Sequence, residues 1–333
     1  ITPLLTLPCC IGANAAMFSV VRSVLLKPLP FPNSERVILI YNSYPRAGVS
    51  RSGASVPELF DRLDGVPALT AQALFRREGI TYGETDAPER LNTIRATPSF
   101  FKVVAVPAFR GRVLNDDDAQ SRRALLSYGF WRRHMGARDT VVGEKIQLGG
   151  QPYEVVGVLP AEFSFLQEDI DLFVPAAFGP ADKQDDRRHN NNWQMIGMTS
   201  PDATQAVVQA QVDAVNARND ERMPQFRQIL KYAGFRSIVV NLRDDLVRDI
   251  RAALYLLWGG VLFVLVIGCV NLANLMMVRA AARSREMATR HAIAVRSLHR
   301  LLGCTLGGAV AVGFLALNVE SFAWWLGMIG VAV

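Results

Sequence analysis

The sequence predicts a membrane α+β protein, with three transmembrane helices and a large α+β extracytoplasmic domain inserted between the first and the second. Residues 252–278 are 27 consecutive positions without an Asp, Glu, Lys, Arg or His side chain. A helix needs about 20 apolar residues to cross a bilayer, so this stretch is long enough. Six arginines and a single acid, Glu286, follow between residues 279 and 300. The middle of the chain instead alternates strand-like and helix-like runs and holds most of the charge.

Proline or charge bounds the other two membrane segments. The first, residues 1–27, has no charged side chain among its first 21 residues, and prolines at 28, 30 and 32 stop the helix. The third, residues 301–319, is 19 uncharged residues rich in glycine, which permits close packing of helices. Because the chain begins with Ile1 and has only a short apolar run after Glu320, we expect a piece of a longer protein without a complete fourth span.

The basic loop at 279–300 indicates the orientation of the chain. Short loops rich in lysine and arginine stay on the cytoplasmic side of a membrane, so we expect this loop inside and residues 28–250 outside. The loop carries a net charge of +5, from six arginines and Glu286, out of +6 for the whole chain. We therefore expect membrane lipid and no nucleic acid as a partner. The alternative is a buried core helix followed by a solvated basic helix.

The central domain, residues 28–250, is expected to have two outer α/β parts, 36–95 and 193–245, around a β-rich insert at 96–190. Each outer part reads as strand, helix, strand. The expected strands lie at 36–41, 70–75, 193–199 and 235–242, and the expected helices begin at the capping box Ser55-Val-Pro-Glu58 and at Asp202, the second running to about Arg222.

The clearest element of the insert is a hairpin at residues 144–159. Two strand-like runs there flank Gly149-Gly150, a pair that permits the positive φ angles of a tight turn. The polar runs 116–118 and 182–192 are interpreted as exposed loops. A cation site at the three aspartates of 116–118 is the less favoured alternative, because consecutive carboxylates on a loop point in different directions.

The chain lacks the motifs of several enzyme classes. It contains no G-x-x-x-x-G-K-[ST], H-E-x-x-H or G-x-S-x-G sequence. All four cysteines lie in apolar runs, at positions 9, 10, 269 and 304. We therefore expect no catalytic, cofactor-binding or metal-binding residue and no enzymatic activity. Asn271 and Asn274 lie inside the second span, where polar side chains more often bond across a helix interface than bind a substrate.

Several stretches, in order along the chain, form one recognisable set. They are Gly12-Ala-Asn-Ala-Ala-Met-Phe-Ser-Val-Val21, Leu25-Leu-Lys-Pro-Leu-Pro30, Trp131-Arg-Arg-His-Met-Gly136, Val142-Gly-Glu-Lys-Ile146, Tyr153-Glu-Val-Val-Gly-Val-Leu-Pro160, Asn271-Leu-Ala-Asn-Leu275, Arg279-Ala-Ala-Ala-Arg283 and Arg285-Glu-Met-Ala288. Together they resemble the MacB/FtsX-type ABC transporter permeases. The resemblance implies a MacB-like periplasmic core domain at 28–250 and an FtsX-like permease region at 251–333.

The resemblance also implies a function and partners. Such a protein is a multi-pass permease of the bacterial inner membrane, of the export type, working as a homodimer or pseudo-dimer of permease modules. A separate cytoplasmic ABC ATPase drives motion that reaches the periplasmic domain, and a periplasmic adaptor is a further expected partner. A membrane-tethered sensor or binding protein without ATPase coupling is the alternative.

Within the basic loop, the coupling helix of this family falls on residues 286–296. At about 100° per residue, Met287 lies on the side that faces the membrane helices, while Ile293 lies among charged residues near Glu286. An exposed isoleucine often has no consequence; the functional interpretation is that Ile293 inserts into a cleft of the ATPase. The expected ATPase-coupling residues are Arg285, Glu286, Met287, Arg290 and Ile293.

Overall fold

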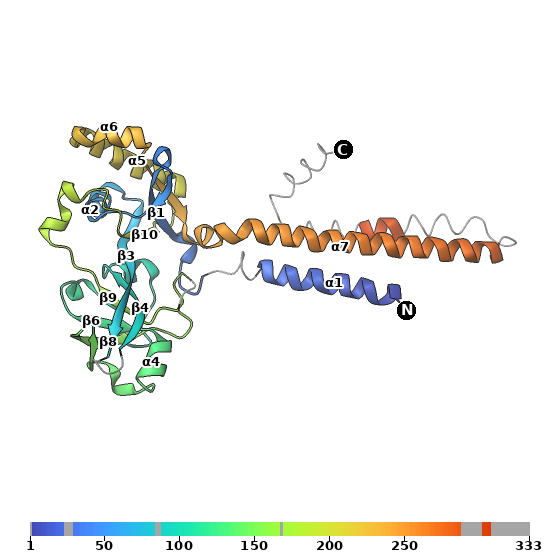
Figure 1. Cartoon of the computed structure of the whole chain (residues 1–333), viewed down its shortest axis with the longest axis horizontal. Helices are drawn as coiled ribbons and strands as arrows, with labels where there is room; N and C mark the ends of the chain where they lie inside the picture. The colour runs from blue at the N-terminus through green and yellow to red at the C-terminus, as the bar shows by residue number, and fades with distance from the viewer. Residues whose placement is uncertain (1, 23–28, 84–87, 167–168, 288–301, 308–333) are drawn as a thin grey trace. The chain divides into compact units, whose positions relative to one another are not determined.

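The computed structural model describes residues 2–22, 29–83, 88–166, 169–287 and 302–307. The chain forms two compact units. One is Ser19–Leu257, which we call the sheet domain, and the other comprises Ile1–Phe18 and Trp258–Val333. Figure 1 shows the strands and the shorter helices of the sheet domain, and the labelled helices α1 and α7.

Four strands form the first half of the sheet in the order β11-β1-β10-β3, with every neighbouring pair antiparallel. A helix connects β1 to β3, and two helices connect β10 to β11, which makes a split β-α-β arrangement of the ferredoxin-like kind. A short strand, β2 (Val49–Ser52), pairs with the end of β1. The elements are β1 (Val37–Tyr44), α2 (Val56–Gly65), β3 (Leu69–Tyr82), β10 (Gln194–Thr199), α5 (Gln205–Arg222), α6 (Pro224–Ala233) and β11 (Arg236–Asn241).

The segment between β3 and β10 extends the same sheet in the order β3-β4-β9-β6-β8-β5. Two of its pairs, β4 with β9 and β6 with β8, are parallel. In Figure 1, α4 lies at the opposite end of the sheet domain from α5 and α6. The elements are β4 (Glu89–Ala96), α3 (Phe100–Val104), β5 (Arg110–Gly111), β6 (Arg123–Leu126), α4 (Tyr128–His134), β7 (Lys145–Leu148), β8 (Gln151–Val158) and β9 (Leu172–Pro175).

Strand β1 lies in the middle of the core, because both of its faces are covered. Leu39 packs with residues of α3 and of the insert on one face. Ile38 and Ile40 pack with α2 and α5 on the other. All three side chains are at most 2% exposed, and a continuous apolar run such as Val37-Ile-Leu-Ile40 is what a strand buried on both faces requires. A third cluster fills the insert around Phe130 and Trp131.

Local signals in the sequence place the ends of several elements correctly. Ser55 and Glu58 form the expected capping box at the start of α2. Gly149 and Gly150 have φ angles of 57° and 74° and join β7 to β8, as the hairpin prediction requires. The prediction that Asp202 caps the next helix is wrong. The cap of α5 is Thr204, whose hydroxyl accepts a hydrogen bond from the amide of Val207.

The interpretation of residues 116–118 as an exposed loop is wrong at its last position. Asp118 is fully buried and forms ion pairs with Arg112 and Arg123. Its carboxylate also accepts a hydrogen bond from the amide of Asn115, at 2.8 Å. Burial alone would raise the pKa of Asp118, but these donors hold it well below its usual range.

The interpretation of 182–192 as an exposed loop fails at Arg188, which is 8% exposed.

One helix in the described part of the chain is long and apolar enough to cross a membrane. It is α7 (Leu242–Met287), whose candidate spanning region is Leu242–Ala280. Helix α1 (Thr2–Val21) contains a shorter apolar segment, Ile11–Val21. The expected third span at 301–319 lies mostly outside the described residues, and its part at 302–307 is helical. The first and third spans therefore remain predictions.

Replacing Asp118 with asparagine should destabilise the sheet domain, because two arginines and an amide lose their charged acceptor. We expect a loss of about 2 kcal/mol in the free energy of unfolding at pH 7, or roughly 4–8 °C in melting temperature, measured by calorimetry of the purified chain in detergent. The folded pKa is depressed, so this contribution is present above about pH 4 and is lost at lower pH. Asp117→Asn, at an exposed neighbour, is the control. Equal melting temperatures for both variants would refute the assignment.

Candidate functional site

The residues expected to contact an ATPase lie at the end of α7 and beyond it. Arg285, Glu286 and Met287 are the last three residues of the helix. Arg290 and Ile293 lie outside the described residues. The structure therefore brings the first three together on one helix, and the coupling surface as a whole stays a prediction.

The other end of α7 is the site that the structure describes in detail. Strand β11 ends at Asn241 and α7 begins at Leu242, so no loop separates the sheet from the helix. The Asn241 side chain accepts a hydrogen bond from the amide of Arg243 at 3.0 Å and donates one to the carbonyl of Glu35 at 2.7 Å. This side chain thus satisfies one of the free amides that begin a helix.

Three further contacts fix the first turns of α7 to the sheet. Leu242 is fully buried in the core beside β1. Asp245 accepts a hydrogen bond from the hydroxyl of Tyr41, on β1, at 2.7 Å, and forms an ion pair with Arg51, on β2. The Arg51 guanidinium also lies 5.0 Å from the centre of the Tyr41 ring. A displacement of this end of α7 would therefore have to move β1 or break these contacts.

Strand β11 is the edge of the sheet, and α5 covers that edge with glutamine side chains. Gln209 donates to the carbonyl of Ser237 at 2.9 Å and accepts from the amide of Val239 at 2.8 Å. Gln205 donates to the carbonyl of Val239 at 2.8 Å. These amides replace the partner strand that an edge lacks, so the strand that continues into α7 is held on both sides.

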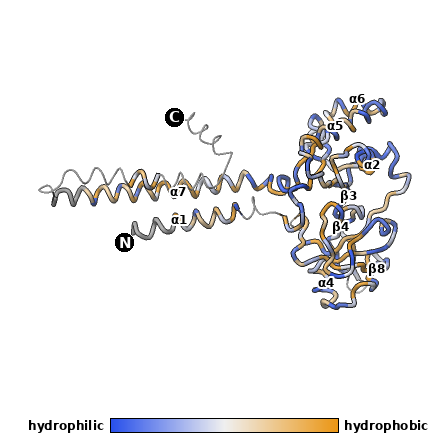
Figure 2. The backbone as a smooth tube through the Cα atoms, turned by 180° about the vertical axis from the view of Figure 1, so that it is seen from behind, coloured by the Kyte–Doolittle hydropathy of each residue, from blue (hydrophilic) through white to orange (hydrophobic). Residues whose placement is uncertain are grey.

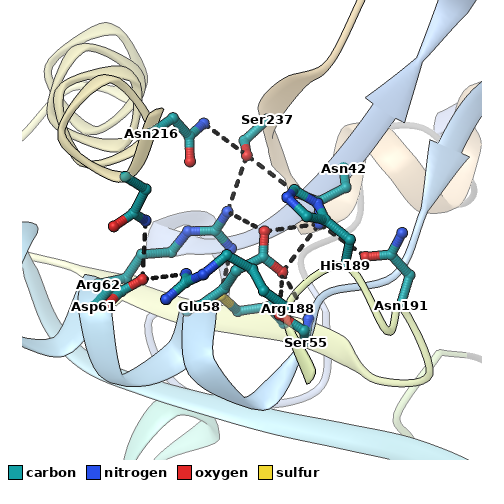
Figure 3. A network of polar contacts seen from close by, with 12 residues as sticks. Asn42, Ser55, Glu58, Asp61, Arg62, Arg188, His189, Asn191, Asn216 and Ser237 are labelled. Carbon is teal, nitrogen blue, oxygen red and sulfur yellow. Dashed lines mark hydrogen bonds and ion pairs between the residues drawn. The ribbon is translucent and has the colours of Figure 1, made fainter. Parts of the chain in front are cut away.

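A buried polar network, shown in Figure 3, links α2 and α5 to strands β1 and β11. Its centre is Arg62 and Glu58 on α2, 0% and 3% exposed, with 3.5 Å between guanidinium and carboxylate. Arg62 donates to the Ser237 hydroxyl on β11 at 2.9 Å. Asn42, on β1, donates to both carboxylate oxygens of Glu58, at 2.8 and 3.0 Å. Asn216 on α5 donates to the same Ser237 hydroxyl at 2.9 Å.

The loop at 182–192 closes this network from the outside. Arg188 pairs with Asp61 on α2 and donates to Asp185 at 2.7 Å. Asn191 accepts from Asn42 at 2.9 Å and donates to the hydroxyl of Tyr44 at 3.0 Å. These residues were missed by sequence reasoning, which treated the run as solvated. A usable signal was present, since a loop that returns from an insert to the main sheet must cross the elements it rejoins.

Burial sets the protonation states in the network. It raises the pKa of Tyr44 to about 12 and lowers the pKa of His189. It also lowers the pKa of Arg62. Burial alone would raise the pKa of Glu58, but the Arg62 charge and the hydrogen bonds of Ser55 and Asn42 lower it. Glu58 is therefore ionised at neutral pH and the imidazole is neutral. The guanidinium of Arg62 stays protonated, as arginine does in proteins.

The Tyr44 hydroxyl and His189 Nδ1 lie 2.9 Å apart. The hydroxyl also accepts a hydrogen bond from Asn191, and it donates to Nδ1 when the neutral imidazole carries its proton on Nε2. We interpret the contact between Tyr44 and His189 as structural. Among the residues that the structure describes, no group of three or more His, Cys, Asp or Glu side chains could hold a metal ion.

In the unit formed by Ile1–Phe18 and Trp258–Val333, a hydrogen bond joins α1 to α7 through a residue that sequence reasoning did not single out. The Asn14 side chain on α1 donates to the carbonyl of Val261 on α7 at 3.1 Å. Asn271 and Asn274, the expected interface residues, are exposed. Several large apolar residues of α7, such as Leu256, Phe263 and Val278, are also more than 60% exposed, and Figure 2 shows the apolar stretch beyond the charged first turns.

The neutral His189 predicts a pH dependence of stability. The unfolded chain binds the proton more tightly than the folded chain, since a free histidine titrates near pH 6.5. Stability should therefore fall as the pH drops below about 6.5. We expect His189→Gln to flatten the change in melting temperature between pH 7.5 and 5, and Tyr44→Phe to reduce it. An unchanged pH profile in His189→Gln would show that the histidine is not held neutral.

A family model described as the MacB-like periplasmic core domain matches residues 4–215. The probable export ATP-binding/permease protein MacB of Pseudomonas entomophila (strain L48) is 22% identical over 255 residues, which cover 70% of this chain and 35% of that protein. The macrolide export ATP-binding/permease protein MacB of Shewanella sp. (strain ANA-3) is 23% identical over 271 residues, 73% of this chain and 38% of that protein. The chain thus spans little more than a third of the length of these relatives.

Solved structures were also found. The periplasmic region of MacB from Actinobacillus actinomycetemcomitans has a TM-score of 0.44 at 12% identity and covers 71% of this chain and 98% of that one. A domain of a putative permease from Porphyromonas gingivalis has a TM-score of 0.44 at 15% identity, over 63% of this chain and 90% of that one. The family model, which matches well over half of the residues, agrees with the resemblance seen in the sequence, and the chain belongs to the family of the MacB-like periplasmic core domain.

Proposed function

We propose that this chain is the permease part of an ABC-type export system, in which a separate cytoplasmic ATPase drives motion of the sheet domain in the periplasm. Family membership supports a membrane permease with a periplasmic domain, and the matched relatives carry names that pair ATP binding with a permease. In this proposal the permease itself has no enzymatic activity and lies in the bacterial inner membrane as a multi-pass protein.

One observation carries the proposal further than family membership. The edge strand β11 passes into α7 without a loop, and Asn241, Leu242 and Asp245 fix the start of the helix to β1 and its neighbours. A sensor or a tethered binding protein needs only an anchor, for which a flexible linker is sufficient. A continuous helix fixed to the sheet favours transmission of motion over simple anchoring.

The membrane arrangement in this proposal follows the sequence. Residues 1–27, 252–278 and 301–319 cross the membrane, with the domain at 28–250 in the periplasm and the loop at 279–300 in the cytoplasm. At 1.5 Å per residue, the 27 residues of the second span give about 40 Å of helix, which exceeds the roughly 30 Å of a hydrocarbon core.

The partners in this proposal are a cytoplasmic ABC ATPase, a second permease module and a periplasmic adaptor. The ATPase contacts the coupling residues Arg285, Glu286, Met287, Arg290 and Ile293. The second module makes a homodimer or pseudo-dimer, and the exposed apolar surface of α7 suits packing against another helix as well as lipid.

Replacing Ile293 with aspartate tests the ATPase contact. Burying an isoleucine in a cleft of a partner contributes roughly 1.5–3 kcal/mol, so Ile293→Asp should reduce co-purification of the ATPase by at least ten-fold while the permease still enters the membrane. Ile229→Asp is the matched control, since Ile229 on α6 is 64% exposed in the sheet domain. Equal amounts of ATPase with Ile293→Asp and with the control would count decisively against the contact.

A further inference from the structure

A basic cleft of about 570 Å³ lies between the two halves of the sheet. Its walls come from β3 and β4, from the residues just before β6, and from the segment that leads from β9 back to β10. Four arginines line it, namely Arg76, Arg95, Arg122 and Arg187, with Asp182 as the acid among its lining residues. Cavities of roughly this size hold small organic ligands.

Two of these arginines, Arg76 and Arg95, share the carboxylate of Glu78. Glu78 lies 2.6 Å from Arg95 and 3.3 Å from Arg76. The Arg95 side chain also donates to the carbonyl of Pro175 at 3.1 Å, and the Arg76 guanidinium lies 4.6 Å from the Trp193 ring centre. Their positions are therefore fixed, and they form the wall of the cleft.

The other two arginines have no such partner. Within the part of the chain that the structure describes, the side chains of Arg122 and Arg187 form no ion pair and no hydrogen bond, and both are exposed. Asp182, the acid among the described lining residues, already accepts a hydrogen bond from the amide of Gly179 at 2.9 Å. After Glu78 and Asp182 are set against the four arginines, the cleft keeps an excess of two positive charges.

We infer that this cleft binds a small organic anion through its phosphate or carboxylate oxygens. A guanidinium presents paired N–H donors that match these groups in a bidentate way. Arg122 lies just before β6, in the second half of the sheet, and Arg187 lies in the 182–192 loop, which pairs with α2 of the first half. A ligand held by both arginines therefore joins the two halves of the domain. The inference does not depend on how the domain is coupled to an ATPase.

Calorimetric titration of the purified chain in zwitterionic nanodiscs, with inorganic pyrophosphate and with citrate at constant ionic strength, tests this site. The arginines of the loop at 279–300 also attract anions, so the cleft is isolated by a double variant, Arg122→Gln with Arg187→Gln. We expect the double variant to weaken binding of at least one probe ten-fold or more. Arg132→Gln, at another exposed arginine outside the cleft, should bind like the parent chain.

The two probes identify the chemistry of the ligand. A loss confined to pyrophosphate assigns a phosphate-bearing ligand, a loss confined to citrate assigns a carboxylate-bearing one, and a loss of both assigns an oxyanion site in general. Because Arg122 and Arg187 are exposed, the melting temperature of the unliganded double variant should match that of the parent. Binding of both probes by the double variant with parental affinity, or no binding by the parent chain, would overturn the inference.

Discussion

Strand β11 and helix α7 are joined by a single peptide bond between Asn241 and Leu242, and much of the domain is arranged to hold that junction. An edge strand is normally the least protected part of a sheet, because half of its backbone groups lack a partner. Here Gln205 and Gln209 of α5 supply those partners, while β1 supplies the other side. The backbone of this edge strand is therefore hydrogen-bonded on both sides, to β1 and to α5.

The buried polar network also contacts strand β11, through Ser237. Ser237 of β11 accepts hydrogen bonds from Arg62 and Asn216 and donates one to Asn42, so α2, α5 and β1 meet at one hydroxyl. Burying Arg62 and Glu58 is costly, and such pairs contribute little net stability compared with apolar residues of the same size. One guanidinium nitrogen of Arg62, Nε, is buried without a partner. We interpret the network as a device that fixes the arrangement of these elements, with stability supplied by the apolar clusters on both faces of β1.

Sequence reasoning was reliable where the controlling contacts are local. The capping box at Ser55 and the hairpin at Gly149-Gly150 depend on residues within four positions of each other, and the buried strand at 37–40 is evident from its unbroken apolar run. It failed where a polar residue is buried by distant segments. Asp118 and Arg188 lie in polar runs that read as solvated. Asn42 meets Ser237 across 195 positions of sequence, a pairing that only the folded sheet creates. The coupling residues at 285–293 remain predictions from sequence pattern and resemblance.

We propose that α7 transmits motion to β11 because it is a continuous helix at the point where it leaves the sheet. Arg248 and Asp249 are exposed residues just beyond the fixed turns, and changing both to glycine should loosen the helix there by about 1 kcal/mol per residue relative to the matched alanine pair. Hydrogen exchange of β1 and β11, measured in the complex with the ATPase before and after ATP, reports the transmission. We expect an ATP-dependent change in exchange in the parent protein and in the alanine pair, and no such change in the glycine pair. An equal change in all three proteins would contradict it.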